Sequence, residues 1–90
     1  MVAAKVIISG HVQGVGFRYF TTDTAKQFPV SGYVRNLATG DVEVVVEGDK
    51  TAVAEFLKEL KSGPRYSSIS NFQIEWQTYE NKYDSFNVRF

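Results

Sequence analysis

The chain has 90 residues, of which 43% are hydrophobic and 22% charged, a balance typical of one globular domain rather than of a disordered or fibrous protein. Ten basic and ten acidic residues cancel, so no extended positive surface is available to attract nucleic acid or anionic lipid. The absence of cysteine excludes disulfides, thiolate chemistry and sulfur-bound zinc, and no apolar run approaches the roughly 18 residues of a membrane span. We therefore expect a single domain over residues 1–90, monomeric and cytoplasmic, with no membrane or nucleic-acid partner.

Hydrophobic periodicity divides the chain into successive strands and helices. Alternating apolar and polar side chains predict strands, whereas apolar side chains at spacings of three and four predict helices. Pro29 has no backbone N–H to donate, so the first helix must end before it, and Asp49 is a favourable N-cap for the second. In chain order we expect a strand over residues 5–12, a helix over 17–28, strands over 30–37 and 41–47, a helix over 50–62, and strands around 72–76 and 86–90.

This element order predicts a ferredoxin-like fold of the α+β class. A βαββαβ order with a short C-terminal strand is that of the split βαβ sandwich, in which an antiparallel sheet carries both helices on one face. The same architecture serves enzymes, metal carriers and RNA-binding modules. The function must therefore come from particular residues.

The loop between the first strand and the first helix is rich in glycine. Residues 10–18 read GHVQGVGFR. Glycines let successive N–H groups converge on one anion, and the start of a helix adds unpaired N–H groups and a positive dipole end. Arg18, just inside the helix, can bind two phosphate oxygens with its planar guanidinium. Taken by itself, the pattern fits a phosphate-binding loop and a tight glycine turn followed by a surface arginine equally well.

A second segment, GYVRN over residues 32–36, places Asn36 near the end of a strand. A carboxamide both donates and accepts hydrogen bonds, so it can orient a water without taking its proton. Beside a hairpin, however, asparagine is commonly a turn residue. Alternation along the strand directs Arg35 to the opposite face, so we do not expect Arg35 in the site.

Together, GHVQGVGFR and GYVRN, with VEVVVEG and the SGP helix end, resemble the acylphosphatase family over nearly the whole chain. The resemblance implies a hydrolase, free of metal and cofactor, in which a water attacks in line and cleaves the carboxyl–phosphate bond of a small acyl phosphate. It implies that Asn36 positions this water and that inorganic phosphate is a product. Because the loop would recognise a tetrahedral anion, we expect inorganic phosphate to be a competitive inhibitor as well. The residues that the resemblance implies bind the phosphoryl group are Gln13, Gly14, Val15, Gly16, Phe17 and Arg18. The chain departs from the commonest family pattern at Pro29 and at Ala38-Thr39, away from these residues.

Few residues are needed to catalyse the hydrolysis of an acyl phosphate, because its leaving group is a carboxylate that departs without a general acid. Charge neutralisation on the phosphoryl oxygens and placement of the water remain, and both are matters of position. No protein base is evident, so we expect the substrate's own phosphate to accept the proton of the water.

Other polar residues have simpler interpretations. His11 is the only histidine, which excludes a multi-histidine metal site, and we expect it to be exposed on its strand. Glu43 and Glu47 share one strand face, and we expect that face to be solvated. Tyr19 and Tyr33 are candidates for the rim of the site.

Two alternative functions remain open. The element order is also that of RRM domains, and GVGFRYF faintly resembles their signature, but it lies at the start of a helix rather than within a central strand. A domain related to a larger carbamoyl-phosphate-processing protein could keep the loop for recognition alone. The presence of Asn36 favours turnover.

Overall fold

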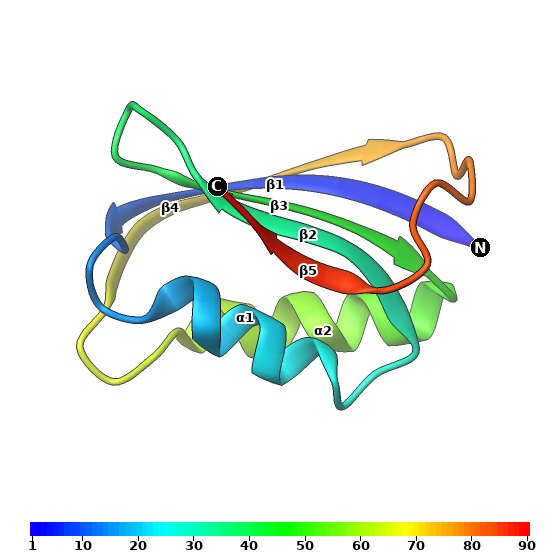
Figure 1. Cartoon of the computed structure of the whole chain (residues 1–90), viewed down its shortest axis with the longest axis horizontal. Coiled ribbons are helices and arrows are strands. Elements are labelled where there is room, and N and C mark those ends of the chain that lie inside the picture. Colours follow the sequence, from blue (N-terminus) through cyan, green and yellow to red (C-terminus); the bar gives the residue numbers. More distant parts are fainter.

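The elements of the computed structural model, which describes residues 1–90, follow the predicted order. They are β1 (Val2–His11), α1 (Phe17–Ala25), β2 (Val30–Asn36), β3 (Val42–Gly48), α2 (Lys50–Ser62), β4 (Ser68–Gln77) and β5 (Phe86–Arg89). One five-stranded sheet forms a layer, and both helices lie side by side on the same face of it (Figure 1). Neither helix has the length and apolarity that crossing a membrane requires.

The strand order in the sheet is β4-β1-β3-β2-β5. The first four of these strands pair antiparallel, as predicted, but β5 pairs parallel with β2, so the sheet is mixed. The cause is the connection over residues 78–85, which reverses the chain after β4. Because β2 runs opposite to β4, the reversed chain arrives at the β2 edge parallel to it.

The sheet register brings the ends of β1 and β2 to the same side of the molecule. Both strands pair antiparallel with β3, and Ile8 of β1 and Asn36 of β2 both lie opposite Val42. Helix α1 packs over β2 and β5, whereas α2 packs over β3 and β1. The loop that leaves β1 and enters α1 therefore lies beside the end of β2.

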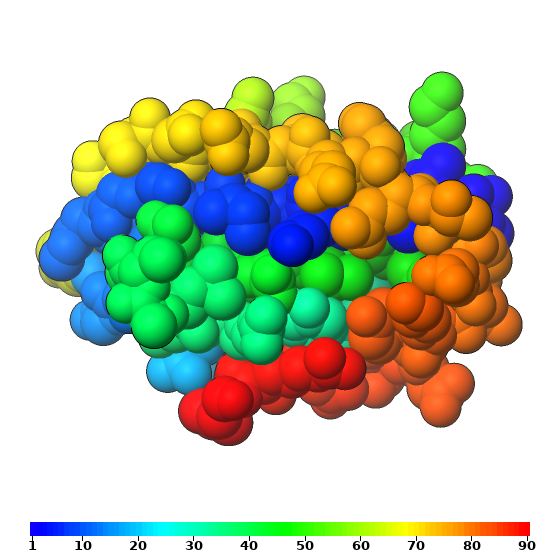
Figure 2. Space-filling view, turned by 90° about the horizontal axis from the view of Figure 1, so that it is seen from above, coloured from blue at the N-terminus to red at the C-terminus, as the bar shows by residue number.

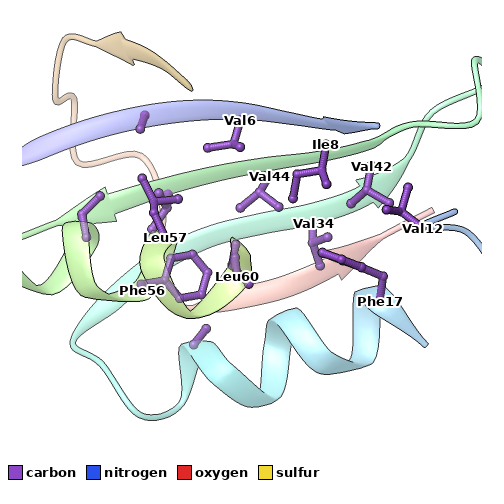
Figure 3. Close-up of a cluster of buried hydrophobic side chains, with 14 residues drawn as sticks. Val6, Ile8, Val12, Phe17, Val34, Val42, Val44, Phe56, Leu57 and Leu60 are labelled. Carbon is purple, nitrogen blue, oxygen red and sulfur yellow. The ribbon is translucent and has the colours of Figure 1, made fainter. Parts of the chain in front are cut away.

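The core lies between the sheet and the helices. Figure 3 shows valines of the strands directed toward the aromatic and leucine side chains of the helices. Helix α2 agrees with the prediction, since the Asp49 carboxylate accepts a hydrogen bond from the Thr51 N–H at 3.2 Å. Its apolar stripe is buried, and it consists of Val53, Phe56, Leu57 and Leu60.

Helix α1 ends at Ala25, three residues before the predicted end at Phe28. The N–H groups of Gln27 and Phe28 donate to the carbonyls of Thr24 and Ala25, so the chain tightens into a turn with bonds between residues three apart. The residue before a proline is also disfavoured in helical conformation. Phe28 still belongs to the apolar layer, and its ring centroid lies 6.4 Å from that of Phe56.

The open face of the sheet is less solvated than expected. Glu43 is only 4% exposed and Glu47 only 3%, so the prediction of a solvated pair was wrong. The N–H groups of Glu80 and Lys82 donate to the Glu47 carboxylate at 3.3 and 2.9 Å. Figure 2, which looks onto this face, shows the segment after β4 in orange closing one end of the sheet.

The Glu43 carboxylate is covered by long side chains from β2. Tyr33 Oη and Arg35 Nε each donate to Glu43 Oε1 at 2.8 Å. Burial alone would raise the pKa of Glu43, but these two hydrogen bonds and the nearby positive charges outweigh it, so the pKa is lowered. Burial, followed by the bond to Glu43, raises the pKa of Tyr33 to about 12. Tyr33 thus belongs to the open face, and its prediction as a rim residue was wrong.

Candidate active site

The loop between β1 and α1 has a backbone that requires glycine at two positions. Gly14 has φ 75° and Gly16 φ 79°, in the left-handed region that side chains disfavour. Gly16 is also the N-cap of α1, and no side chain caps the first turn, which contains no acidic residue. The amides at the start of α1 therefore lack the side-chain acceptor that Asp49 provides for α2.

A pocket of about 290 Å³ opens beside this uncapped helix end. The loop, the first turns of α1, and the ends of β2 and β5 all contribute to it. Its lining residues are Val12, Gly14, Gly16, Phe17, Arg18, Tyr19, Thr22, Asn36, Val88 and Phe90. Arg18 is the only charged side chain among them. The helix dipole and this one cation thus favour an anion of small size.

Arg18 lies in the first turn of α1, half-buried, and is part of no ion pair. Its guanidinium Cζ is 5.1 Å from the centroid of the Phe90 ring. Stacking on a ring face leaves the N–H groups at the edge of the guanidinium free to donate to a ligand.

Asn36 is the last residue of β2, on the same face as the fully buried Val34. Its Oδ1 atom is buried and accepts no hydrogen bond from the protein. Nearly all buried polar atoms have a partner, so an unpaired acceptor in a pocket marks a place for a ligand or a water. Arg35 points to the opposite face, where it binds Glu43, and this confirms its exclusion from the site.

The structure brings most of the predicted site residues together. Gly14, Gly16, Phe17 and Arg18 line the pocket with Asn36, but Gln13 and Val15 do not. The Val15 side chain packs against the core. The Gln13 side chain points to the hairpin after β2, where Nε2 donates to the carbonyls of Leu37 and Asp41, each at 2.8 Å. Only the backbone of these two residues could contact an anion in the pocket.

Tyr19 and His11 were predicted to lie outside the phosphate-binding group. Tyr19 lies at the rim, as predicted, and is 77% exposed. His11 is exposed on β1, also as predicted. No group of three or more His, Cys, Asp or Glu side chains in the structure is placed to hold a metal ion.

Sequence reasoning did not assign four residues of the pocket wall to the site, namely Val12, Thr22, Val88 and Phe90. Thr22 lies one turn after Arg18, and helical spacing could have indicated it. Val88 and Phe90 arrive through the parallel pairing of β5 with β2, in which Val88 lies opposite Val34. No local sequence signal predicts that pairing.

Comparison with known proteins agrees with this geometry. The sequence model of the acylphosphatase family matches residues 4–88. An acylphosphatase from Syntrophotalea carbinolica is 44% identical over 89 residues, which are 99% of this chain and 97% of the relative. The crystal structure of acylphosphatase from Bacillus subtilis superposes with a TM-score of 0.96 at 30% identity, covering 100% of both chains. HypF of T. kodakarensis contains a similar region, with a TM-score of 0.86 and 30% identity, covering 99% of this chain but only 12% of HypF.

Proposed function

The chain belongs to the acylphosphatase family and is a hydrolase of acyl phosphates, and from this premise we propose how its residues divide the reaction. Arg18 and the backbone N–H groups of residues 13–18 bind the phosphoryl group, and Asn36 positions the attacking water. The observation that carries the proposal is that Arg18, Asn36 and the uncapped end of α1 line one pocket.

The phosphoryl group needs donors on several oxygens at once. The amides at the start of α1 point along the helix axis, and Gly14 and Gly16 give the preceding backbone the curvature that directs further amides to the same point. Arg18 adds a forked cation from the side. As the transition state spreads charge over three equatorial oxygens, these fixed donors stabilise it without rearranging.

The water needs one fixed acceptor. Asn36 Oδ1 is buried and without a protein partner, so it can accept a hydrogen bond from a water and direct an oxygen lone pair to phosphorus. The carboxylate leaves as a weak base. No Asp, Glu or His side chain lines the pocket, so the water's proton passes to a phosphoryl oxygen of the substrate.

Several finer statements are part of the same proposal. The substrate is a small acyl phosphate, the product phosphate competes with it, and the chain acts as a cytoplasmic monomer without cofactor, metal, membrane or nucleic-acid partner. The zero net charge supports the absence of a nucleic-acid partner.

RNA binding has less support than hydrolysis. An RRM stacks bases on aromatic side chains of its central strands. Here the open face of β1 and β3 presents Lys5, Ile7, Glu43, Val45 and Glu47, none of which is aromatic.

The direct test is a turnover assay with an aryl acyl phosphate in excess chelator, with Arg18→Ala as the inactive control. Release of carboxylate and phosphate at unchanged rate in chelator supports the proposal. Binding of phosphate without turnover would favour a recognition domain, and activity that returns only with added divalent metal would contradict the metal-free mechanism.

A further inference from the structure

We infer that Gln13 is a positioning residue, whose side chain fixes the distance between the phosphate-binding loop and Asn36. The inference rests on the proposed roles of Arg18 and Asn36. It gives Gln13 a part in the reaction that is separate from any contact between its backbone and phosphate.

The geometry is a bridge between the two motifs. Gln13 immediately precedes Gly14 in the loop, and its Nε2 donates to the carbonyl oxygens of Leu37 and Asp41, each at 2.8 Å. Leu37 directly follows Asn36 in the chain. A primary amide has two N–H groups, and both are used here.

The acceptors belong to a rigid turn. The N–H of Leu37 donates to the Asp41 carbonyl at 2.8 Å, and the N–H of Gly40 donates to the Leu37 carbonyl at 3.1 Å. Each carbonyl has two lone pairs, so it can accept from Gln13 as well. The two bonds of Gln13 therefore attach the loop to a turn whose backbone is already fixed by its own hydrogen bonds. They depend on the backbone of the hairpin and not on its side chains.

No other hydrogen bond in the structure joins residues 12–16 to residues 36–42. Strands β1 and β2 do not pair with each other, because β3 lies between them. Apolar packing of α1 on β2 limits their separation but is not directional. The two bonds of Gln13 are thus the directional link between the group that binds the phosphoryl and the group that places the water.

The reaction makes this link important for rate. In-line attack requires the water to lie within about 3 to 3.5 Å of the reacting atom, and a misplacement of roughly 1 Å can lower a rate about 100-fold. Loss of these two bonds leaves the loop and the end of β2 intact but lets the position of the loop vary relative to Asn36. The expected effect is on kcat, with little change in phosphate affinity.

The experiment is a double-mutant cycle of Gln13→Met and Asn36→Ala. Methionine matches the length of glutamine without its donors, so packing is retained. We measure kcat and KM with an aryl acyl phosphate, the Kd of inorganic phosphate, and urea unfolding for wild type, both single variants and the double variant. Thr39→Val is the matched control, because it removes from the same hairpin the bond that Thr39 Oγ1 donates to Asp41 Oδ2 and the one that it accepts from the Asp41 N–H, without touching the loop.

In the wild-type background, Gln13→Met should lower kcat at least about tenfold and change the phosphate Kd less than about threefold. In the Asn36→Ala background it should lower kcat by less than about threefold, since the group it positions is gone. Thr39→Val should retain full kcat. Gln13→Glu, which sets a carboxylate against two carbonyl oxygens, should be at least as impaired as Gln13→Met.

Two outcomes would overturn the inference, and they differ from failure of the proposed function. In the first, Asn36→Ala lowers kcat, and Gln13→Met lowers kcat in the Asn36→Ala background by the same factor as in wild type. In the second, Gln13→Met weakens phosphate binding as much as it lowers kcat. Either outcome would show that Gln13 does not act through Asn36. If Asn36→Ala itself has wild-type kcat, the proposed role of Asn36 fails, and the bridge fails with it. Variants that unfold in the assay buffer are identified by the urea curves, and Gln13→Asn, one methylene shorter, then replaces Gln13→Met in the same cycle.

Discussion

The guanidinium of Arg18 lies over the ring of Phe90, with Cζ 5.1 Å from the ring centroid. One residue earlier, the Cζ of Arg89 lies 4.0 Å from the centroid of the Tyr33 ring, on the other face of the sheet. The end of β5 is thus held by stacking on one face and supports Arg18 on the other. The Arg18 side chain is therefore orientated by residues far from the loop in sequence.

Phe90→Ala should therefore raise KM and the Kd of phosphate about two- to fivefold, with a smaller effect on kcat, because an exposed cation–π contact contributes roughly 0.5 to 1 kcal/mol. Phe90→Tyr should retain the wild-type values, whereas Phe90→Leu should not. The matched control is Tyr66→Ala, since Tyr66 is an exposed aromatic beside Arg65, at 5.9 Å, away from the pocket. Equal phosphate affinity in Phe90→Ala and wild type would show that the stacking has no role.

The raised pKa of Tyr33 makes the free energy of unfolding depend on pH, although Tyr33 does not line the pocket. Its pKa is raised from 10.0 to about 12 in the folded protein. The stabilisation is therefore fully present below pH 10 and is lost as the pH rises through about 12. The difference in free energy of unfolding between wild type and Tyr33→Phe should shrink over this interval, as measured by urea denaturation. A constant difference from pH 9 to 12 would contradict the raised pKa of Tyr33, which follows from its burial and its bond to Glu43.

Inorganic phosphate should inhibit competitively, and sulfate should do the same, because the proposed binding group, the uncapped start of α1 with Arg18, would recognise a tetrahedral anion rather than the acyl part. Steady-state rates at several phosphate concentrations check this. Purely uncompetitive inhibition would place the anion at another site.

Arg18→Ala should raise KM and lower kcat together, since in the proposed mechanism the guanidinium contacts the phosphoryl group in both ground and transition states. Arg18→Lys should recover little, because a single ammonium cannot reproduce the forked pair of donors. An Arg18→Ala protein that binds phosphate normally, as judged by calorimetry, would remove Arg18 from the site.

The sequence predicts those parts of this molecule that depend on local pattern. The stripe of α2, its Asp49 cap and the glycine loop before Arg18 all follow from short-range spacing and were confirmed. The parallel pairing of β5 depends on how the chain crosses the sheet after β4, so Phe90 could not be placed in advance.

The burial of Glu43 and the side-chain position of Gln13 were missed because both depend on contacts with residues distant in the sequence. Alternation along a strand gives the face of a residue but not what covers that face, and Tyr33 and Arg35 cover Glu43. The loop motif indicated that Gln13 belongs near the phosphate, whereas its side chain bonds to a hairpin that lies 24 residues further along the chain.

Asn36→Ala tests the central claim most directly, namely that one side chain places the water while a separate group binds the phosphoryl. The measurement is the steady-state comparison of Asn36→Ala with wild type, together with the Kd of phosphate and a check of folding. We predict that kcat falls by about 10² to 10³ while KM and the phosphate Kd remain nearly unchanged. Full kcat in Asn36→Ala would reduce Asn36 to the last residue of a strand and contradict the account.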